Sequence, residues 1–410
     1  MGLRLSNALL ILAAASLAAD QPTLTLSPNR ALCDELTTIH AAGLAPNERV
    51  TIEAQLEDGG GHRWASHREF TADAQGSIEA SPQDSVALIW SMMPEDKHVA
   101  AYQSPRDLGA QVIDFRLLRK NEALATARLE QLSMAEGVER IPLHEGDLRG
   151  VLFVPPEAHK ERRPAILVVG GSNGGLPGRN AAWLASHGYV ALALAYFHYE
   201  DLPPTLAAIP LEYFGRALVW MMNRPEVQKD HIGVMGTSRG GELALQLGSM
   251  YSPIHAVVAY VPANVRFAAY PMNDRIPYAW TWKGQPLAFV PVRSRGQPAV
   301  TMLATIPVEE TRGPILMISG TDDRVWPSAE MADSVLARLK HEHFAYSAEN
   351  LKYPHAGHIA GRPDIVPTWH GEMRHPISGT SMNLGGSPEG NAASSLDAIP
   401  KVLEFLKRNL

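Results

Sequence analysis

A serine within a Gly-x-Ser-x-Gly pentapeptide is the residue of this chain best suited to covalent chemistry. Gly236-Thr-Ser238-Arg-Gly240 follows a short apolar segment and precedes a stretch, from Glu242 on, of helical character. Strand, sharp turn and helix form a nucleophile elbow, which exposes the serine hydroxyl at the carboxyl end of a strand. The two glycines fit, because side chains there would collide where strand and helix pass close together. The pattern predicts that Ser238 is a nucleophile; an ordinary strand-to-helix turn is the alternative for the pentapeptide alone.

An acid and a histidine follow Ser238 in the order expected of an α/β-hydrolase. Asp323 lies in the turn after an apolar segment at 315–318, and His358 follows a further expected strand. A serine hydroxyl is a weak nucleophile at neutral pH and needs a base to take its proton. Histidine has a suitable pKa for that exchange, and a carboxylate fixes its tautomer and stabilises the imidazolium. These residue types in this order predict a serine hydrolase.

Both partners have a neighbour of the same type. Asp322 precedes Asp323, and one of the two aspartates can instead cap the helix that begins near residue 327. We prefer Asp323, because the fourth position of a Gly-x-x-Asp loop points back across the strand ends, whereas Asp322 would face solvent or backbone. His355 precedes His358, but the glycine just before His358 lets the chain turn tightly and present the ring. We therefore place His355 at the surface or in a supporting position.

A glycine-rich run supplies the candidate site for the oxyanion. Residues 170–175, Gly-Gly-Ser-Asn-Gly-Gly, directly follow the apolar segment at 165–169. The oxyanion donors of this fold are the N–H after the nucleophile and one N–H from this earlier loop. The first is Arg239, and the second is Ser172 or Asn173. A phosphate cradle is the alternative, but the run is neither Gly-x-Gly-x-x-Gly nor a P-loop.

Composition limits the other classes of function. The chain has 410 residues, of which 45% are hydrophobic and 19% charged, which is normal for a globular protein and suggests at least two domains. The formal net charge of −7 with no basic stripe argues against nucleic acid as a partner. Cys33 is the single cysteine, which excludes an intramolecular disulfide. The histidines show no spacing typical of a metal site on a helix, so we expect no metal. The predicted serine hydrolase chemistry needs no cofactor.

The first 19 residues predict a secretory signal. Arg4 supplies positive charge, residues 8–19 are apolar, and Ser16 to Ala19 offer a small-residue cleavage site. The apolar stretch is far short of the roughly 20 residues that cross a bilayer, and no cysteine follows it for a lipid anchor. We therefore expect a secreted or periplasmic protein, or a cytoplasmic one if the segment is not cleaved. A misassigned start or a fraying N-terminal helix is the alternative.

The pattern of elements divides the remaining chain into two parts. Residues 22–138 hold short alternating segments separated by turns, which predicts a β-sandwich. In residues 140–410, apolar runs alternate with helix-like segments, which predicts a mostly parallel sheet covered on both faces. Residues 262–307 interrupt this alternation with aromatic residues and prolines, at a place where this fold often carries a lid. Those aromatics either line a pocket for an acyl chain or pack the insertion onto the sheet.

Several stretches in both parts together form a combination that is specific to one family of proteins. In the first part they are 27–46, 66–70, 72–76 and 88–92. In the second part they are 184–197, 199–203, 211–214, 320–326, 353–358 and 385–386. In these stretches, the chain resembles the family of acyl-CoA thioesterases and bile acid-CoA:amino acid N-acyltransferases, and the resemblance covers nearly everything after the signal segment.

The resemblance implies an N-terminal immunoglobulin-like sandwich followed by an α/β-hydrolase domain. It also implies a triad that falls on Ser238, His358 and Asp323. Thioesterase members use serine, whereas the amino acid-conjugating branch uses cysteine, so Ser238 favours hydrolysis over transfer. Acyl-CoA is the implied substrate. Because acyl-CoA is a metabolite of the cytosol and organelles, the predicted export leaves another ester or thioester open.

The sequence thus predicts a serine hydrolase that cleaves a thioester or ester through an acyl-enzyme on Ser238, with acyl-CoA as the leading substrate. The alternatives are an acyltransferase that passes the acyl group to an amine or alcohol, an exported carboxylesterase or peptidase-like hydrolase, and a non-catalytic binding protein on a hydrolase scaffold. The lack of a propeller-length N-terminal region argues against a peptidase of prolyl-oligopeptidase type. The intact order of serine, acid and histidine argues against a binding protein. Oligomeric state is not predicted.

Overall fold

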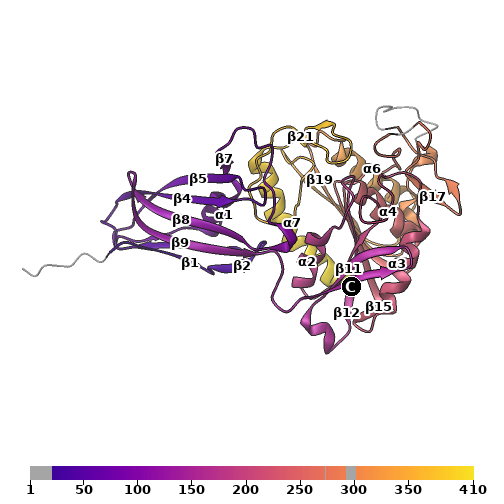
Figure 1. Cartoon of the computed structure of the whole chain (residues 1–410), viewed down its shortest axis with the longest axis horizontal. Coiled ribbons are helices and arrows are strands. Elements are labelled where there is room, and N and C mark those ends of the chain that lie inside the picture. Colours follow the sequence, from indigo (N-terminus) through magenta and orange to yellow (C-terminus); the bar gives the residue numbers. More distant parts are fainter. Residues whose placement is uncertain (1–20, 273, 292–301) are drawn as a thin grey trace, which may run out of the picture.

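The computed structural model describes residues 21–272, 274–291 and 302–410. The predicted signal segment at 1–19 lies outside the described residues, as do residues 273 and 292–301 of the predicted insertion. The described chain forms a β-rich body and a larger mixed body, which lie next to each other along the longest axis of the molecule (Figure 1).

The first body is built from two sheets around one core. The smaller sheet has the strand order β1 (Thr23–Ser27), β3 (Thr38–Ala42), β6 (Ile78–Glu79). The larger has the order β2 (Arg30–Leu32), β9 (Glu122–Leu132), β8 (Gln111–Arg119), β4 (Arg49–Glu57), β5 (Arg63–Thr71), β7 (Met93–Pro94). Every second residue of β4 is buried, as expected for a strand with one face on the core. A β-rich first part is therefore confirmed, while its immunoglobulin-like character stays a prediction.

The second body contains an eight-stranded sheet. Its strand order is β10 (Glu139–Glu145), β11 (Leu148–Val154), β13 (Val190–Ala195), β12 (Arg163–Val169), β15 (Val227–Thr237), β16 (Ile254–Tyr260), β19 (Ile315–Gly320), β20 (Ala348–Tyr353). Only β11 pairs antiparallel, with β10 and β13, and the other pairs are parallel. All residues of β13 and β19 are buried, because parallel strands covered on both faces meet no solvent. The predicted α/β fold is confirmed, and the predicted boundary at residues 138–140 lies at the start of β10, after the last strand of the first body.

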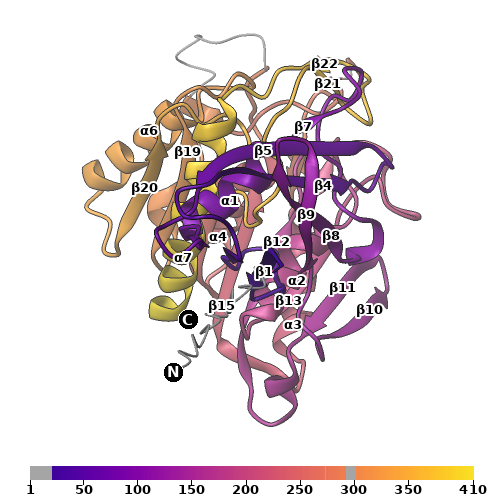
Figure 2. The ribbon, with the colours of Figure 1, turned by 90° about the vertical axis from the view of Figure 1, so that its left-hand side faces the viewer.

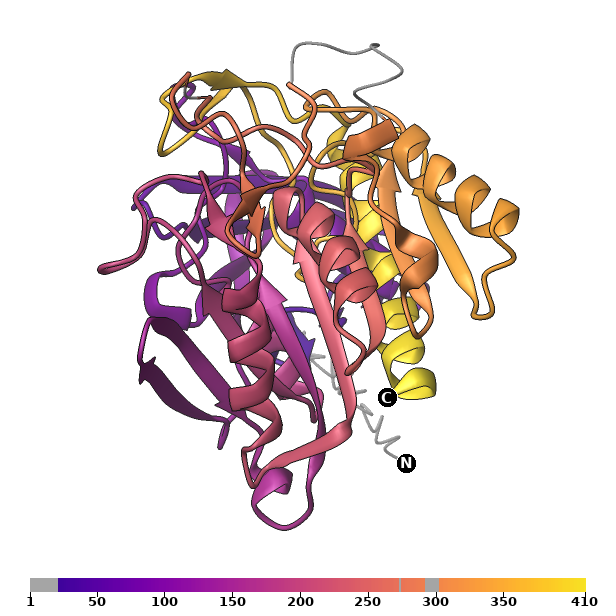
Figure 3. The ribbon, with the colours of Figure 1, turned by 90° about the vertical axis from the view of Figure 1, so that its right-hand side faces the viewer.

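Helices cover both faces of this sheet. On one face, α3 (Glu212–Met222), α4 (Arg239–Met250) and α6 (Ser328–His341) share a core with the strands. On the other face, α2 (Gly178–Ser186) and α7 (Pro388–Asn409) do so. Figure 3 views the molecule with α3 and α4 in front of the strands. The short elements are α1 (Pro82–Trp90), η1 (Arg106–Leu108), η2 (Pro156–His159), η3 (Val308–Glu310) and two small sheets, β14 (Ile209–Pro210) with β17 (Trp280–Trp282) and β18 (Gln285–Pro286), and β21 (Met373–Arg374) with β22 (Ser381–Met382).

The two bodies are joined through buried contacts on the side of α2 and α7. Ile365 packs into the core of the first body, and its N–H donates to Cys33 O at 2.7 Å. Asp34 accepts hydrogen bonds of 2.8 Å from Trp183 Nε1 and from His187 Nε2. Helices α1 and α7 contact each other, as Figure 2 shows. The first body therefore supports the helices behind the sheet.

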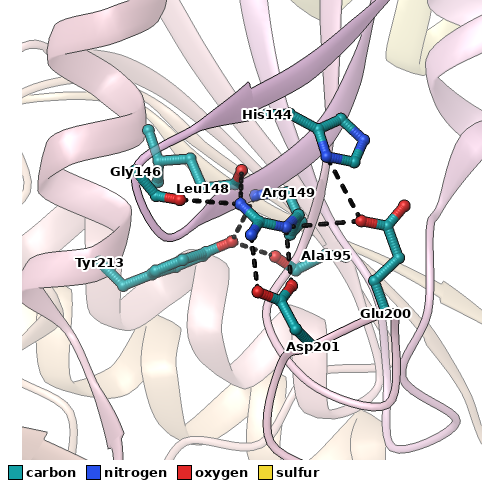
Figure 4. A network of polar contacts seen from close by, with 8 residues as sticks. All are labelled: His144, Gly146, Leu148, Arg149, Ala195, Glu200, Asp201 and Tyr213. Atoms are coloured by element: carbon teal, nitrogen blue, oxygen red, sulfur yellow. Dashed lines mark hydrogen bonds and ion pairs between the residues drawn. The ribbon is translucent and has the colours of Figure 1, made fainter.

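An ion-pair network on β11 fixes the loop that follows β13 (Figure 4). Arg149 binds both carboxylate oxygens of Asp201 at 2.7 Å and also pairs with Glu200 at 3.4 Å. Tyr213 on α3 accepts from the Arg149 N–H at 3.1 Å and donates to Ala195 O at 2.5 Å. Strand, loop and helix are thereby held together at the carboxyl edge of the sheet.

The fixed loop in turn supports the glycine-rich run at 170–175. Tyr196 Oη donates to Gly170 O at 2.6 Å, and Phe197 O accepts from Gly175 N at 3.0 Å. Both aromatic side chains are buried. The run predicted to hold the oxyanion is therefore a braced loop, positioned by residues far from it in the sequence.

Candidate active site

Ser238 stands in a strained turn between β15 and α4. Its backbone has φ 61° and ψ −119°, a conformation that costs a non-glycine residue free energy and that clusters at functional sites. Its N–H donates to Tyr260 O at 2.9 Å. A Cβ on Gly236 would lie 1.9 Å from Gly240 O, and a Cβ on Gly240 would lie 2.5 Å from Gly170 O. Both glycines are required by the close approach of strand, helix and loop, which is the geometry of a nucleophile elbow.

The three residues predicted to cooperate are joined by hydrogen bonds. His358 Nε2 lies 2.8 Å from Ser238 Oγ, and His358 Nδ1 lies 2.8 Å from Asp323 Oδ2. The histidine side chain is 7% exposed and the aspartate side chain is 0% exposed. A carboxylate at Nδ1 favours the proton there, which leaves the Nε2 lone pair facing the serine hydroxyl. The arrangement allows His358 to take the Ser238 proton.

Asp323 is held by its own loop, and the two competing residues lie outside the hydrogen-bonded group. The Asp323 Oδ1 accepts from the N–H groups of Val325 and Trp326 at 3.0 and 3.2 Å. Asp322 accepts from Gly386 N at 3.0 Å, which is the main cause that holds the pKa of its carboxyl below the usual range. His355 is exposed. These positions agree with the choice of Asp323 and His358 made from the sequence.

The His358 ring is also fixed by a tryptophan that the sequence analysis gave no role. Trp326 meets the His358 ring edge-on, with centroids 4.9 Å apart and planes at 88°. It stacks on Phe267 of the insertion at 5.4 Å and donates from Nε1 to Val261 O at 3.1 Å. Because an imidazole that swings away cannot accept a proton from Ser238, this packing preserves the geometry.

The predicted oxyanion donors share one cavity with Ser238. Ser172, Asn173 and Arg239 all line it. A Cβ on Gly171 would lie 3.4 Å from the Ser238 Cβ, so the loop passes directly beside the nucleophile. Ser172 and Asn173 both stay candidates for the loop donor.

The side chain of Arg239 forms a buried ion pair and hydrogen bonds that the sequence analysis missed. Its Nε lies 3.0 Å from Glu242 Oε2 in an ion pair whose side chains are 3% and 0% exposed. Its guanidinium also donates to Phe267 O and Ala268 O at 3.1 and 2.8 Å. Trp280 Nε1 donates to Glu242 Oε1 at 2.7 Å. Burial raises the pKa of Glu242 against the opposing effect of Arg239, and the pair fastens the insertion to α4.

The cavity above Ser238 has a volume of about 760 Å³. Most of its wall comes from residues 269–272 and 373–384, with Val325, Trp326 and Ile359. Its apolar lining includes Met272, Met373 and Met382, and its charged lining is Arg239, Arg324 and Arg374. Among the described residues that line it, there is no carboxylate. Tyr270 of the insertion lines the cavity, whereas Phe267 and Trp280 are buried in packing. Some of the insertion's aromatics therefore line the pocket and others pack the insertion onto the rest of the domain.

His375 is a residue of this wall that the sequence did not reveal. It is 2% exposed, and its Nε2 lies 3.0 Å from Ser172 Oγ. Burial lowers its pKa from 6.5. It lies in a stretch rich in proline, glycine and serine without periodicity, which offered no signal.

Comparison with known proteins identifies the family. A family model described as "Acyl-CoA thioester hydrolase/BAAT N-terminal region" matches residues 34–145, and one described as "BAAT / Acyl-CoA thioester hydrolase C terminal" matches residues 209–410. Acyl-coenzyme A thioesterase 1 of Mus musculus is 31% identical over 417 residues, which cover 95% of this chain and 97% of that protein. The chain belongs to this family.

This hydrolase is similar to other thioesterases over the same length. The mitochondrial acyl-coenzyme A thioesterase 2 of Mus musculus is 32% identical, covering 95% of this chain and 89% of that protein. Among solved structures, the α/β hydrolase GrgF from Penicillium is 18% identical with a TM-score of 0.40, over 66% of this chain and 98% of that one. In the part of the hydrolase that the structure describes, no helix is both long and apolar enough to span a membrane.

Proposed function

We propose that this hydrolase cleaves an acyl-CoA thioester through an acyl-enzyme on Ser238. The observation that carries the proposal is the hydrogen-bonded series from Asp323 through His358 to Ser238, at the floor of an apolar cavity. Ser238 supplies the nucleophile, His358 the base, and Asp323 the charge that stabilises the imidazolium. Each role is the one predicted from residue type and order.

The proposed reaction has two halves. Ser238 Oγ attacks the thioester carbonyl carbon while His358 takes its proton, and the N–H groups of Arg239 and of Ser172 or Asn173 stabilise the oxyanion. The intermediate then breaks its carbon–sulfur bond, and His358 returns the proton to the leaving thiolate. In the second half His358 takes a proton from water, which attacks the acyl-enzyme carbonyl carbon. The bond from that carbon to Ser238 Oγ then breaks, His358 returns the proton to Ser238 Oγ, and the free acid is released.

The cavity supports a substrate with an apolar acyl group and an anionic leaving group. Methionine side chains adapt to ligands of different shape, so Met272, Met373 and Met382 suit an acyl chain. Arg324 and Arg374 are exposed at the same cavity, and Arg324 also pairs with Asp322 Oδ1 at 3.2 Å. An acid-free lining is informative in a chain of net charge −7, because it favours entry of a negatively charged substrate such as a CoA phosphate ester.

The nucleophile being serine favours hydrolysis over transfer to an amine. An oxygen ester on Ser238 favours attack by water, whereas the thioester that a cysteine would form is more readily attacked by an amine. An acyltransferase is thus the second candidate.

The test is a substrate panel with purified protein. Acyl-CoAs of increasing chain length and the matching p-nitrophenyl esters are compared for the parent and Ser238→Ala, with His355→Ala as the control for loss of an exposed side chain. We expect release of CoA and free acid, and a fall in kcat on the order of 10⁴ or more for Ser238→Ala. Near-parent activity of Ser238→Ala would refute the mechanism.

Other outcomes of the panel identify the alternatives. Conjugates formed when glycine or taurine is present would establish transfer, and cleavage of esters alone would establish a carboxylesterase. No turnover, with no Ser238-dependent labelling by a fluorophosphonate probe, would leave a binding protein.

We also propose that residues 1–19 are a secretory signal, on the sequence pattern given above. Mass measurement of the protein from fractionated cells tests this. An exported protein lacking residues 1–19 is expected, and a cytosolic protein with that segment intact would contradict export and remove the objection to acyl-CoA.

A further inference from the structure

The protonation of the His375 ring is fixed by the backbone around it. Its Nδ1 accepts from the N–H groups of Ile377 and Ser378 at 3.2 and 3.3 Å. A nitrogen that accepts cannot carry a proton, so the neutral ring holds its proton on Nε2. Burial lowers the pKa of His375, and the nearby His198 lowers it further, which keeps the ring neutral.

The Nε2 proton of His375 is therefore donated to Ser172. The two heavy atoms lie 3.0 Å apart, and Ser172 Oγ is the acceptor. A hydroxyl oxygen that accepts one hydrogen bond still has its own proton to donate. Among the described residues Ser172 Oγ has no other hydrogen-bond partner, and it lines the same cavity as Ser238. The O–H of Ser172 is thus available to a substrate atom beside the nucleophile.

The His375 ring is held rigidly enough to orient a donor. The backbone N–H of His375 donates to Thr380 O at 2.9 Å, which closes the β21–β22 hairpin around the residue. The Tyr270 ring meets it edge-on at 4.7 Å, and Tyr270 Oη shares a hydrogen bond of 2.8 Å with Ser378 Oγ. Donors that are oriented before the reaction stabilise developing charge without a cost of reorganisation.

We propose that the Ser172 hydroxyl is an additional donor to the oxyanion that forms when Ser238 attacks, and that His375 is the positioning residue that orients this hydroxyl. The inference rests on the proposed acyl-enzyme mechanism and adds a side-chain donor to the backbone N–H groups. The hydrogen bond from the Ser172 hydroxyl to the substrate's carbonyl oxygen shortens and strengthens as that oxygen gains negative charge. No proton leaves Ser172 or His375 during the reaction.

Two substitutions of His375 separate this role from mere support of the hairpin. In His375→Asn, the amide oxygen takes the place of Nδ1 and still accepts from Ile377 and Ser378, but no donor reaches Ser172. In His375→Gln, the longer amide places an N–H group near the original Nε2. A structural role predicts that Asn is the better replacement, whereas orientation of Ser172 predicts that Gln is.

The experiment measures kcat and KM for Ser172→Ala, Ser172→Thr, His375→Asn, His375→Gln and the double variant Ser172→Ala/His375→Asn, with melting temperatures to confirm folding. We expect Ser172→Ala to lower kcat about 100-fold with little change in KM, and Ser172→Thr to recover most of it. His375→Asn is expected to lower kcat about tenfold and His375→Gln to recover activity. In the double variant, the loss should equal that of Ser172→Ala alone, because both changes remove one hydrogen bond.

Two results would overturn the inference. One is a kcat for Ser172→Ala within about twofold of the parent in a folded protein. The other is a His375→Asn loss that is as large in the Ser172→Ala background as in the parent. The same series on a p-nitrophenyl ester separates this from failure of the proposed function: ester cleavage still reports on the donor if acyl-CoA is not a substrate, whereas an active Ser238→Ala refutes the mechanism itself.

Discussion

The two sides of the active-site cavity are built in different ways. Ser238, Asp323 and His358, here called the strand side, each follow the carboxyl end of a strand, β15, β19 and β20. Residues 269–272 and 373–384, here called the loop side, come from the insertion and from the β21–β22 hairpin, outside the eight-stranded sheet. The strand side holds its groups by hydrogen bonds of 2.8 Å, whereas the loop side offers methionines and an arginine.

The difference indicates a division of labour. A buried sheet fixes the reacting groups to within the tolerance that proton transfer requires, and loops set on that scaffold determine what is bound. The hydrogen bond from His375 to Ser172 crosses between a loop-side residue and the glycine-rich loop beside Ser238. Substitutions on the strand side should therefore act on kcat, and most of those on the loop side on KM.

The largest effect is expected where the strand side loses its charge. Asp323→Asn keeps the shape of the carboxylate but presents the wrong hydrogen-bond pattern to His358 Nδ1, so kcat should fall about 10⁴-fold with KM little changed. Asp322→Asn is the matched control for kcat, since the Asp322 carboxylate binds Gly386 N and Arg324 instead of His358. We expect it to lose less than about tenfold in kcat. Steady-state kinetics of both variants measure the two losses, and an equal loss of kcat in both would contradict the assignment of Asp323.

The next effect concerns the stability of the elbow. In Gly236→Ala, the new methyl group would meet Gly240 O at 1.9 Å, and backbone cannot move as a flexible side chain can. We expect a loss of about 3 kcal/mol in the free energy of unfolding. Gly178→Ala on α2 is the control, because its Cβ would meet only Phe153 Cζ at 3.8 Å. Urea unfolding measures both, and a Gly236→Ala variant as stable as the parent would show that strand and helix do not approach as closely at the elbow as described.

The strand side could be predicted from the sequence, whereas of the loop side only the insertion could be suggested as a pocket lining and the stretch 373–384 could not. Ser238, Asp323 and His358 each follow an apolar strand, and their order along the chain is a local and sequential property. The contact of His375 with Ser172 joins residues 203 positions apart, and that of Trp280 with Glu242 joins two separate elements. Such pairs depend on how the chain packs, and the stretch around His375 has no periodicity that would mark it.

A smaller effect is expected for the arginines of the cavity. Arg324→Gln with Arg374→Gln removes two exposed positive charges, so KM for acyl-CoA should rise about tenfold at low salt and less at high salt. The p-nitrophenyl ester of the same acid carries no phosphate and serves as the control substrate. Kinetics on both substrates decide. An equal rise in KM for the ester would mean that the arginines shape the cavity and do not bind the leaving group.

The smallest effect is expected for His370, a histidine next to the loop side whose burial should lower the stability of the protein in acid. His370 Nε2 donates to Gly385 O at 3.0 Å, and Gly385 is bridged to Asp323. Burial lowers the pKa of His370 from 6.5. Below that pH the unfolded chain binds the proton more readily than the folded protein, so the free energy of unfolding falls as the pH drops through 6.5 toward the lower folded pKa.

His370→Gln retains a donor for Gly385 O and removes the titrating group. Relative to its own value near pH 8, where the imidazole is neutral in both states, the free energy of unfolding of the variant should therefore fall less than that of the parent down to about pH 5.5. Urea unfolding across this range measures the difference. His375 and the carboxylates are common to both proteins, so their titration cancels and the remaining slope belongs to His370. Parallel curves would mean that His370 gains enough from its surroundings, when charged, to offset its burial.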